Sequence, residues 1–142
     1  MRTWTAQALT DARPADVLVA LTDTDAVARW SPVPFDVEDD SVRRLRAGTR
    51  TRVSGRLAGV RVGFDVAVEH ADERHLRLTA HGPVSMDVAY DVEPSGDATE
   101  VRASVSVRPG RGLLSTVMAE ATAGLLRAGA LDCALDRMVR TA

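Results

Sequence analysis

The chain has 142 residues, of which 45% are hydrophobic, and its 18 basic and 20 acidic residues give a net charge of −2. This length and composition predict one globular domain, residues 1–142, with a core of its own. The near-neutral charge excludes the basic surface expected of a nucleic-acid-binding protein. The single cysteine, Cys133, excludes an intrachain disulfide framework and a cysteine-based metal cluster. No stretch has the apolar length of a membrane span or resembles a signal peptide, so we expect a cytoplasmic protein.

The first thirty residues predict a strand followed by two short helices. Residues 2–10 alternate in size and polarity, which is typical of a strand. Pro14 suits the first turn of a helix, and Asp16 suits the positive end of its dipole. Residues 22–25 (TDTD) separate this helix from a second one, which ends at Trp30 because two prolines follow within four residues.

Residues 35–108 predict six further strands that form an antiparallel meander. Apolar and polar residues alternate along most of this region, so one face of the sheet is expected to be buried and the other solvated. Short turns between the runs favour antiparallel neighbours. The solvated face carries Arg on some strands and Asp or Glu on others, which favours cross-strand ion pairs. The predicted strands are residues 35–38, 48–57, 60–69, 76–81, 84–93 and 101–108.

The side chains on the predicted inward face include no Asp, Glu, Arg or Lys. They are Thr51, Val53, Leu57, Val62, Phe64, Val66, Val68, Leu76, Leu78, Ala80, Val84, Met86, Val88, Tyr90, Val101, Ala103, Val105 and Val107. Thr51 and Tyr90 are the polar members of this set. Two alternatives stay open for the Tyr90 hydroxyl: it donates a hydrogen bond to a ligand carbonyl, or it pairs with a backbone group, as buried tyrosines usually do.

The segment from Gly112 to the C-terminus contains no proline and is rich in Ala and Leu, so we predict one long helix. This helix is the element expected to cover the apolar face of the sheet. Small residues on its apolar side, among them Ala121 and Ala128, permit either close packing or a cavity, and the sequence leaves both open. The predicted apolar side consists of Leu114, Val117, Ala121, Leu125, Ala128, Leu135 and Val139.

The histidines and Trp30 are the remaining candidates for chemistry. His70 is in phase with the inward residues of its strand, so it is either an acid/base group at the cavity mouth or the polar end of a strand. His75 and His81 share the solvated face and lack a third ligand, so no metal site is expected. Trp30 either closes the mouth of a pocket or anchors the two short helices.

Three segments resemble the sequences of one superfamily. Residues 14–23, followed by Trp30, resemble its first-helix pattern, and residues 46–50 (RAGTR) resemble its x-x-G-x-R entry to a strand. Residues 90–94 (YDVEP) and 99–101 (TEV) resemble its Y-x-x-x-P…T-x-V strands. Together with the order of elements, the whole chain resembles the SRPBCC superfamily, also called START or Bet v 1-like. Within it, the chain is most similar to the bacterial polyketide cyclase/dehydrase and lipid-transport-like branch.

The resemblance implies an α+β helix-grip fold of order β-αα-β6-α, in which a curved antiparallel sheet wraps around a long C-terminal helix. It also implies a hydrophobic cavity between sheet and helix. The residues expected to line this cavity are Trp30, Thr51, Val53, Phe64, Val66, Leu78, Met86, Val88, Tyr90, Leu114, Val117, Met118, Ala121 and Leu125. No cofactor, metal, nucleic acid or membrane span is implied, and monomer and homodimer both stay open.

Three functions follow from the resemblance. The first is binding of a small apolar or amphipathic molecule, such as a lipid or a polyketide, and the uncharged inward face favours it. The second is an enzyme of the polyketide cyclase or aromatase type, with His70 and Tyr90 as acid/base or hydrogen-bonding groups. The third is a protein-interaction domain, like the chaperone-activator relatives of this fold. Fold alone does not choose among them.

Overall fold

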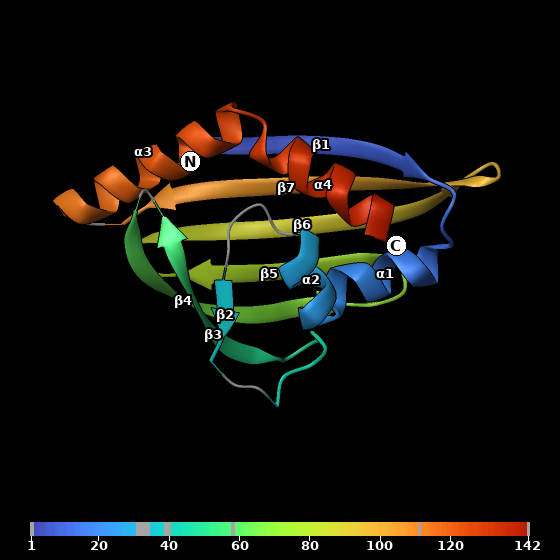
Figure 1. Ribbon diagram of the computed structural model, residues 1–142, viewed down its shortest axis with the longest axis horizontal. Helices are drawn as coiled ribbons and strands as arrows, with labels where there is room; N and C mark the ends of the chain where they lie inside the picture. Colours follow the sequence, from blue (N-terminus) through green and yellow to red (C-terminus); the bar gives the residue numbers. More distant parts are fainter. Residues whose placement is uncertain (1, 31–34, 39–40, 58, 111, 142) are drawn as a thin grey trace.

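The computed structural model describes residues 2–30, 35–38, 41–57, 59–110 and 112–141. Within these residues, one strand and two short helices are followed by six more strands and then by helices, so the predicted α+β helix-grip architecture is confirmed (Figure 1). The elements are β1 (Arg2–Thr10), α1 (Pro14–Thr22), α2 (Thr24–Trp30), β2 (Phe35–Val37), β3 (Arg50–Leu57), β4 (Val60–Ala71), β5 (His75–His81), β6 (Val84–Ser95), β7 (Ala98–Pro109), α3 (Leu113–Arg127) and α4 (Ala130–Thr141).

The strands form one antiparallel sheet in the order β1-β7-β6-β5-β4-β3-β2. Successive strands from β2 to β7 are neighbours, as the short turns predict, and β1 closes the far edge by pairing with β7 from Arg2 opposite Val107 to Thr10 opposite Thr99. The sheet is curved and does not close into a barrel, and the helices all lie on one side of it (Figure 1). It therefore has a single face that needs an apolar cover.

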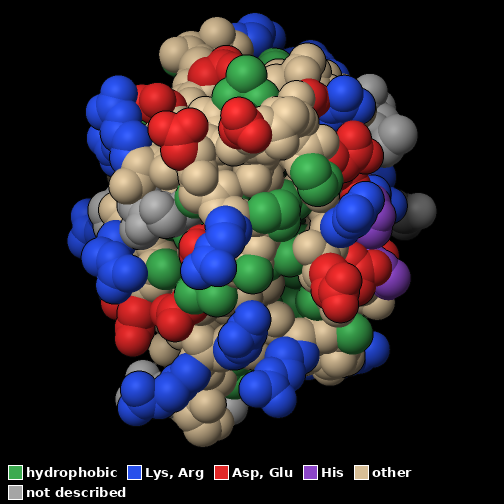
Figure 2. Space-filling model, turned by 90° about the vertical axis from the view of Figure 1, so that its right-hand side faces the viewer, with side chains coloured by type: hydrophobic (Ala, Val, Ile, Leu, Met, Phe, Trp, Pro, Cys, Tyr) green, Lys and Arg blue, Asp and Glu red, His purple; other side chains and the backbone are tan. Residues whose placement is uncertain are grey.

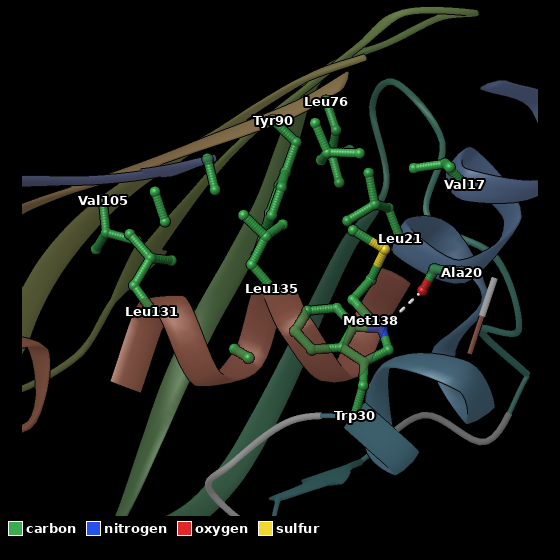
Figure 3. Packing of buried hydrophobic residues seen from close by; sticks show 14 of the residues in the cluster. Val17, Ala20, Leu21, Trp30, Leu76, Tyr90, Val105, Leu131, Leu135 and Met138 are labelled. Atoms are coloured by element: carbon green, nitrogen blue, oxygen red, sulfur yellow. Dashed lines mark hydrogen bonds between the residues drawn. The ribbon is translucent and has the colours of Figure 1, made fainter. Parts of the chain in front are cut away.

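The main core lies between this face and the helices α1, α2 and α4. Leu131, Leu135 and Met138 project from α4 toward the sheet, where they meet residues such as Leu76 and Tyr90 (Figure 3). Buried side chains recur along α4 with the period of a helix, because those at positions 131, 135 and 138 are each less than a tenth exposed. A smaller cluster packs Met118 of α3 on Val62 and Phe64 of β4.

Trp30 belongs to the main core. Its side chain is 7% exposed, and its indole N–H donates a hydrogen bond of 2.8 Å to the backbone carbonyl of Ala20 (Figure 3). This bond ties the end of α2 to α1 while the ring packs beside Met138. The position matches the anchoring alternative for Trp30, and Trp30 lines none of the cavities described below.

The prediction of one long C-terminal helix is wrong, because the chain bends between α3 and α4. Gly129 has a φ of +92°, a conformation that residues with a side chain rarely adopt. The amides of Ala128 and Gly129 close α3 on the carbonyls of Gly124 and Leu126, at 3.0 and 3.1 Å. The predicted apolar side is also wrong within α3, because Val117 is 49% exposed while its neighbour Met118 is 1% exposed.

We predict that Gly129→Ala lowers the free energy of unfolding by about 1–2 kcal/mol, because a Cβ strains the backbone at this φ. Gly124→Ala is the matched control, since Gly124 lies inside α3 and a Cβ there meets no atom within 4 Å. The control should raise the same free energy by about 0.5–1 kcal/mol. Urea unfolding of both variants tests the pair, and equal effects of the two alanines would contradict the assignment of the bend to Gly129.

Cross-strand ion pairs cover the outer face of the sheet, as the alternation of charge predicts. Arg52 pairs with Asp65 at 2.9 Å, and Arg108 pairs with Asp87 at 3.0 Å. The Asp91 carboxylate accepts hydrogen bonds from His75 at 2.7 Å and from Arg77 at 2.8 Å. Partial burial raises the pKa of Asp91, but the bonds from Arg77 and His75 outweigh it, so the pKa lies below its usual range.

We predict that Asp91→Asn lowers the free energy of unfolding at neutral pH by about 0.5–1 kcal/mol, because the group is partly exposed and the pair is screened. A pKa lowered by folding stabilises the protein above the unfolded pKa of about 3.9, and this contribution is lost as the pH falls through the folded pKa. The difference in free energy of unfolding between the variant and the parent should therefore disappear at acidic pH. Asp97→Asn, in the turn after β6, is the control. If the stability difference between Asp91→Asn and the parent persisted at acidic pH, the lowered pKa of Asp91 would not be its cause.

Candidate ligand-binding site

A cavity of about 330 Å³ lies between the sheet and the C-terminal helices, and we call it the main cavity. Its walls are almost entirely apolar. Its sheet side consists of Phe35, Val53, Ser54, Gly55, Arg56, Val62, Phe64, Met86, Val88, Tyr90 and Val105, and its helix side of Thr122, Leu125, Leu126, Ala130, Leu131 and Ala134.

The main cavity exists because the lining is small where the sheet and the helices face each other. Gly55 pairs with Phe35 on one side and with Val62 on the other, so no side chain projects from this point of β3. On the opposite wall, Ala130 and Ala134 start the first two turns of α4. The cavity thus lies beneath the bend between α3 and α4.

The mouth of the main cavity is marked by the lining residues that reach solvent. Arg56 is exposed at the end of β3, and Leu125 of α3 is 42% exposed. Phe35, on the edge strand β2, is half-buried. The opening therefore lies between the β2–β3 edge of the sheet and α3. It presents one cationic group beside an apolar passage.

Tyr90 supplies an unused hydrogen-bonding group to the main cavity. Its side chain is 8% exposed, and its hydroxyl has no hydrogen-bond partner among the described residues. Desolvation by burial raises the pKa of Tyr90 to about 12, so the phenol is neutral at physiological pH and keeps its proton. Of the two sequence alternatives, the backbone-paired hydroxyl is thus not seen in the structure. A neutral donor in an apolar cavity can bind a carbonyl or ether oxygen of a ligand.

The residues predicted to line one cavity are distributed over several places. Six of them line the main cavity: Val53, Phe64, Met86, Val88, Tyr90 and Leu125. Thr51, Val66 and Leu78 line a neighbouring cavity, together with Val53. Trp30 and Met118 are buried in the two packed clusters, Val117 is exposed, and Ala121 is half-buried outside both cavities. The side chain of Leu114 lies outside the described residues.

Several lining residues were missed by the sequence reasoning. Phe35 lies in a strand of only three residues, too short for a clear alternation. Ala130, Leu131 and Ala134 follow the bend, so the phase carried over from α3 misplaces them. The glycine after Ala128, flanked by small residues, was the signal that a helix ends there.

His70 does not reach the main cavity, contrary to the phase argument. The pairing of β4 with β5 shifts register between Val68 and His70, and this β-bulge changes the side on which the later residues project. The His70 side chain is 54% exposed, and its Nε2 lies 2.6 Å from a carboxylate oxygen of Asp72. The structure therefore does not bring His70 and Tyr90 together. The described residues also hold no cluster of three or more His, Cys, Asp or Glu with the spacing of a metal site.

A larger surface hollow, of about 710 Å³, has a different character. It lies between α1, the β4–β5 turn and residues 44–46, with apolar residues such as Leu18 and Leu45 beside charged residues such as Arg46 and Arg74. Figure 2 shows hydrophobic side chains gathered in the middle of this face, with charged side chains around them. A charged rim suits a polar or protein surface better than a wholly apolar molecule, so the main cavity is the candidate site.

The fold and the cavity agree with a comparison of the sequence with known families. Residues 1–142 match the family described as polyketide cyclase/dehydrase and lipid transport. The chain belongs to this family. The membership confirms the resemblance to the SRPBCC superfamily, and it supports a ligand-binding or cyclase role. No curated protein sequence matched, and in the described residues no helix is long and apolar enough to cross a membrane.

Solved structures show the same fold. Protein CV1439 from Chromobacterium violaceum has a TM-score of 0.75 and 16% sequence identity, over 99% of this chain and 96% of that chain. TTHA0849 from Thermus thermophilus has a TM-score of 0.72 and 17% identity, over 99% and 96% of the two chains. DynU16, a protein of the dynemicin biosynthetic locus, has a TM-score of 0.61 and 21% identity, over 97% of this chain and 46% of DynU16. At these identities the likeness concerns the fold alone.

We predict that Tyr90 ionises in the folded protein with a pKa of about 12, against about 10 in urea. A pKa raised by folding stabilises the protein fully below the unfolded pKa, and this contribution is lost as the pH rises through the folded pKa. Because Tyr90 is the sole tyrosine, an absorbance titration reports it directly. A folded-state pKa near 10 would show that the phenol is solvated.

Replacement of the same residue tests whether the hydroxyl is unpaired. Tyr90→Phe should leave the free energy of unfolding unchanged or raise it, because no hydrogen bond within the protein is lost. If the hydroxyl were hydrogen-bonded within the protein, the same substitution would lower the free energy of unfolding by about 1 kcal/mol. Thermal unfolding at neutral pH distinguishes the two results.

Proposed function

We propose that this member of the polyketide cyclase/dehydrase and lipid transport family binds a small, largely apolar molecule that carries a hydrogen-bond acceptor. The observation that carries the proposal is the unpaired, neutral Tyr90 phenol in a largely apolar cavity. Burial of apolar surface would supply most of the affinity, at about 25 cal/mol per Å² removed from water. The Tyr90 hydroxyl would fix the orientation of the ligand by donating to its oxygen.

The volume of the main cavity limits the size of this molecule. About 330 Å³ is near the lower end of the range of about 300–1,000 Å³ that small-molecule sites occupy. A ligand with one to three rings, or a single acyl chain, is therefore the class that we propose. A lipid with two acyl chains is too large to be enclosed by the apolar walls of the main cavity.

The alternative of a cyclase is supported less well by the arrangement of ionisable groups. Proton transfer needs an acid or base within about 3 Å of the reacting atom, directly or through one water. Among the described residues that line the main cavity, the titratable groups are Tyr90 and Arg56, and Arg56 lies at the mouth. A raised pKa makes Tyr90 a hydrogen-bond donor rather than a base at neutral pH. We therefore propose binding, with the ligand held and oriented.

We predict that Ala130→Leu weakens binding of the neutral fluorescent probe N-phenylnaphthylamine by about tenfold or more, because the added carbons occupy apolar space worth about 0.8 kcal/mol per methylene. Ala128→Leu is the matched control, since Ala128 is exposed, lies two residues away and does not line the main cavity. Probe fluorescence gives the Kd of each variant, and thermal unfolding checks that both remain folded.

Two outcomes would overturn the proposal. If the parent protein does not bind the probe, and dodecanol does not raise its thermal stability, then the main cavity takes no apolar ligand. If Ala130→Leu and Ala128→Leu bind the probe equally well, then binding occurs elsewhere, with the surface hollow as the alternative place. The position of the substitution thus separates binding in the main cavity from binding on the surface.

A further inference from the structure

A second cavity, of about 190 Å³, adjoins the main cavity on the same face of the sheet, and we call it the inner cavity. It is covered by α2 and β2 rather than by the C-terminal helices. Its walls consist of Thr24, Val27, Phe35, Val37, Leu45, Thr51, Val53, Val66 and Leu78. Phe35 and Val53 line both cavities, so the two spaces share a wall.

Phe35 is the part of this shared wall that lies on the edge strand β2. It belongs to β2, a three-residue strand at the edge of the sheet, where it pairs with Gly55 of β3 and where the strand has a partner on one side only. Its side chain is half-buried and also lines a groove on the outer surface. Changes of side-chain rotamer are common when partners bind, even where the backbone moves little. Turning the Phe35 ring toward the outer groove would join the two cavities.

The inner cavity contains a hydroxyl group without a partner. The Oγ1 atom of Thr51 is buried and has no hydrogen bond among the described residues. The other hydroxyl on its walls, that of Thr24, donates to the backbone carbonyls of Val42 and Arg43, at 3.1 and 3.3 Å. Buried polar atoms in proteins are nearly always paired, so an unpaired hydroxyl in a cavity indicates a place where a ligand atom completes the bond.

We propose that the main and inner cavities form one site for an elongated apolar molecule with an oxygen near each end. This inference rests on the proposed function. One ligand oxygen accepts a hydrogen bond from the Tyr90 hydroxyl in the main cavity. The other forms a hydrogen bond with the Thr51 hydroxyl in the inner cavity. The apolar body of the ligand lies along the shared wall, past Val53 and the displaced Phe35 ring. Ligands of this class are long-chain diols and hydroxy-acyl esters.

The experiment compares straight-chain alcohols with the α,ω-diols of the same length, from eight to fourteen carbons, as competitors of N-phenylnaphthylamine. In the parent protein, one diol length should bind about two- to tenfold more tightly than its monoalcohol, the gain expected from one hydrogen bond between neutral groups. Thr51→Val removes the hydroxyl at nearly constant volume. It should abolish the preference for the diol, whereas Ala128→Leu, which lies outside both cavities, should keep it.

Two further variants keep the test independent of one substitution. Thr51→Ser keeps the hydroxyl and should keep the diol preference. Val66→Phe fills the inner cavity and should abolish the preference. Thermal unfolding of each variant checks the fold.

Every result decides the question. A diol preference that survives in Thr51→Val, or its absence from the parent protein, overturns the inference while the proposed function stands. If neither alcohols nor diols displace the probe or raise thermal stability, then the inference and the proposed function both fail.

Discussion

Alternate side chains of the sheet project to one curved face, and this face is apolar from β1 to β3. Such a face has to be covered, and the rest of the structure depends on how the cover is divided among the helices. α4 and the two short helices pack on one part of it through large side chains, such as Met138, Leu135 and Trp30. Over the remainder some of the facing residues are small, among them Gly55, Ala130 and Ala134. The close packing and the cavities thus have the same origin, a single apolar face with an uneven cover.

The bend at Gly129 determines where the helices leave part of the sheet's apolar face unpacked. α3 is held at one end by Met118, which packs on Val62 and Phe64, and α4 is held by Leu135 and Met138 in the main core. Between these two anchors the chain passes over the sheet at the bend, where Ala130 and Ala134 face Gly55 and its neighbours. A straight helix would place one continuous row of side chains on the sheet. Two helices meeting at an angle do not, and the main cavity occupies the space beneath their junction.

Much of the fold was predictable, because period-two alternation is a local signal that survives folding. It identified the strands, the face that they bury and five of the six correctly predicted residues of the main cavity, while the sixth, Leu125, followed from the helical period. The errors occur where one residue interrupts a period. In an alanine-rich segment, Gly129 is compatible with a continuous helix, and only its positive φ shows that the helix ends there. The bulge before His70 moves that side chain to the surface without any change in composition. Pairing of the Tyr90 hydroxyl depends on which atoms of distant strands and helices surround it, and no local pattern contains that information.

The unpaired hydroxyls of Tyr90 and Thr51 are features of the site that folding alone does not explain. A buried hydroxyl without a partner costs about 1–3 kcal/mol, and an alternative apolar residue of similar shape avoids this cost. Phenylalanine in place of Tyr90 and valine in place of Thr51 would each keep the packing of the sheet. Their occurrence in adjoining apolar cavities, which share Phe35 and Val53 as a wall, has a common explanation if both hydroxyls meet ligand atoms. On that view the apolar walls provide affinity, while the positions of Tyr90 and Thr51 set the spacing of oxygens that the site selects.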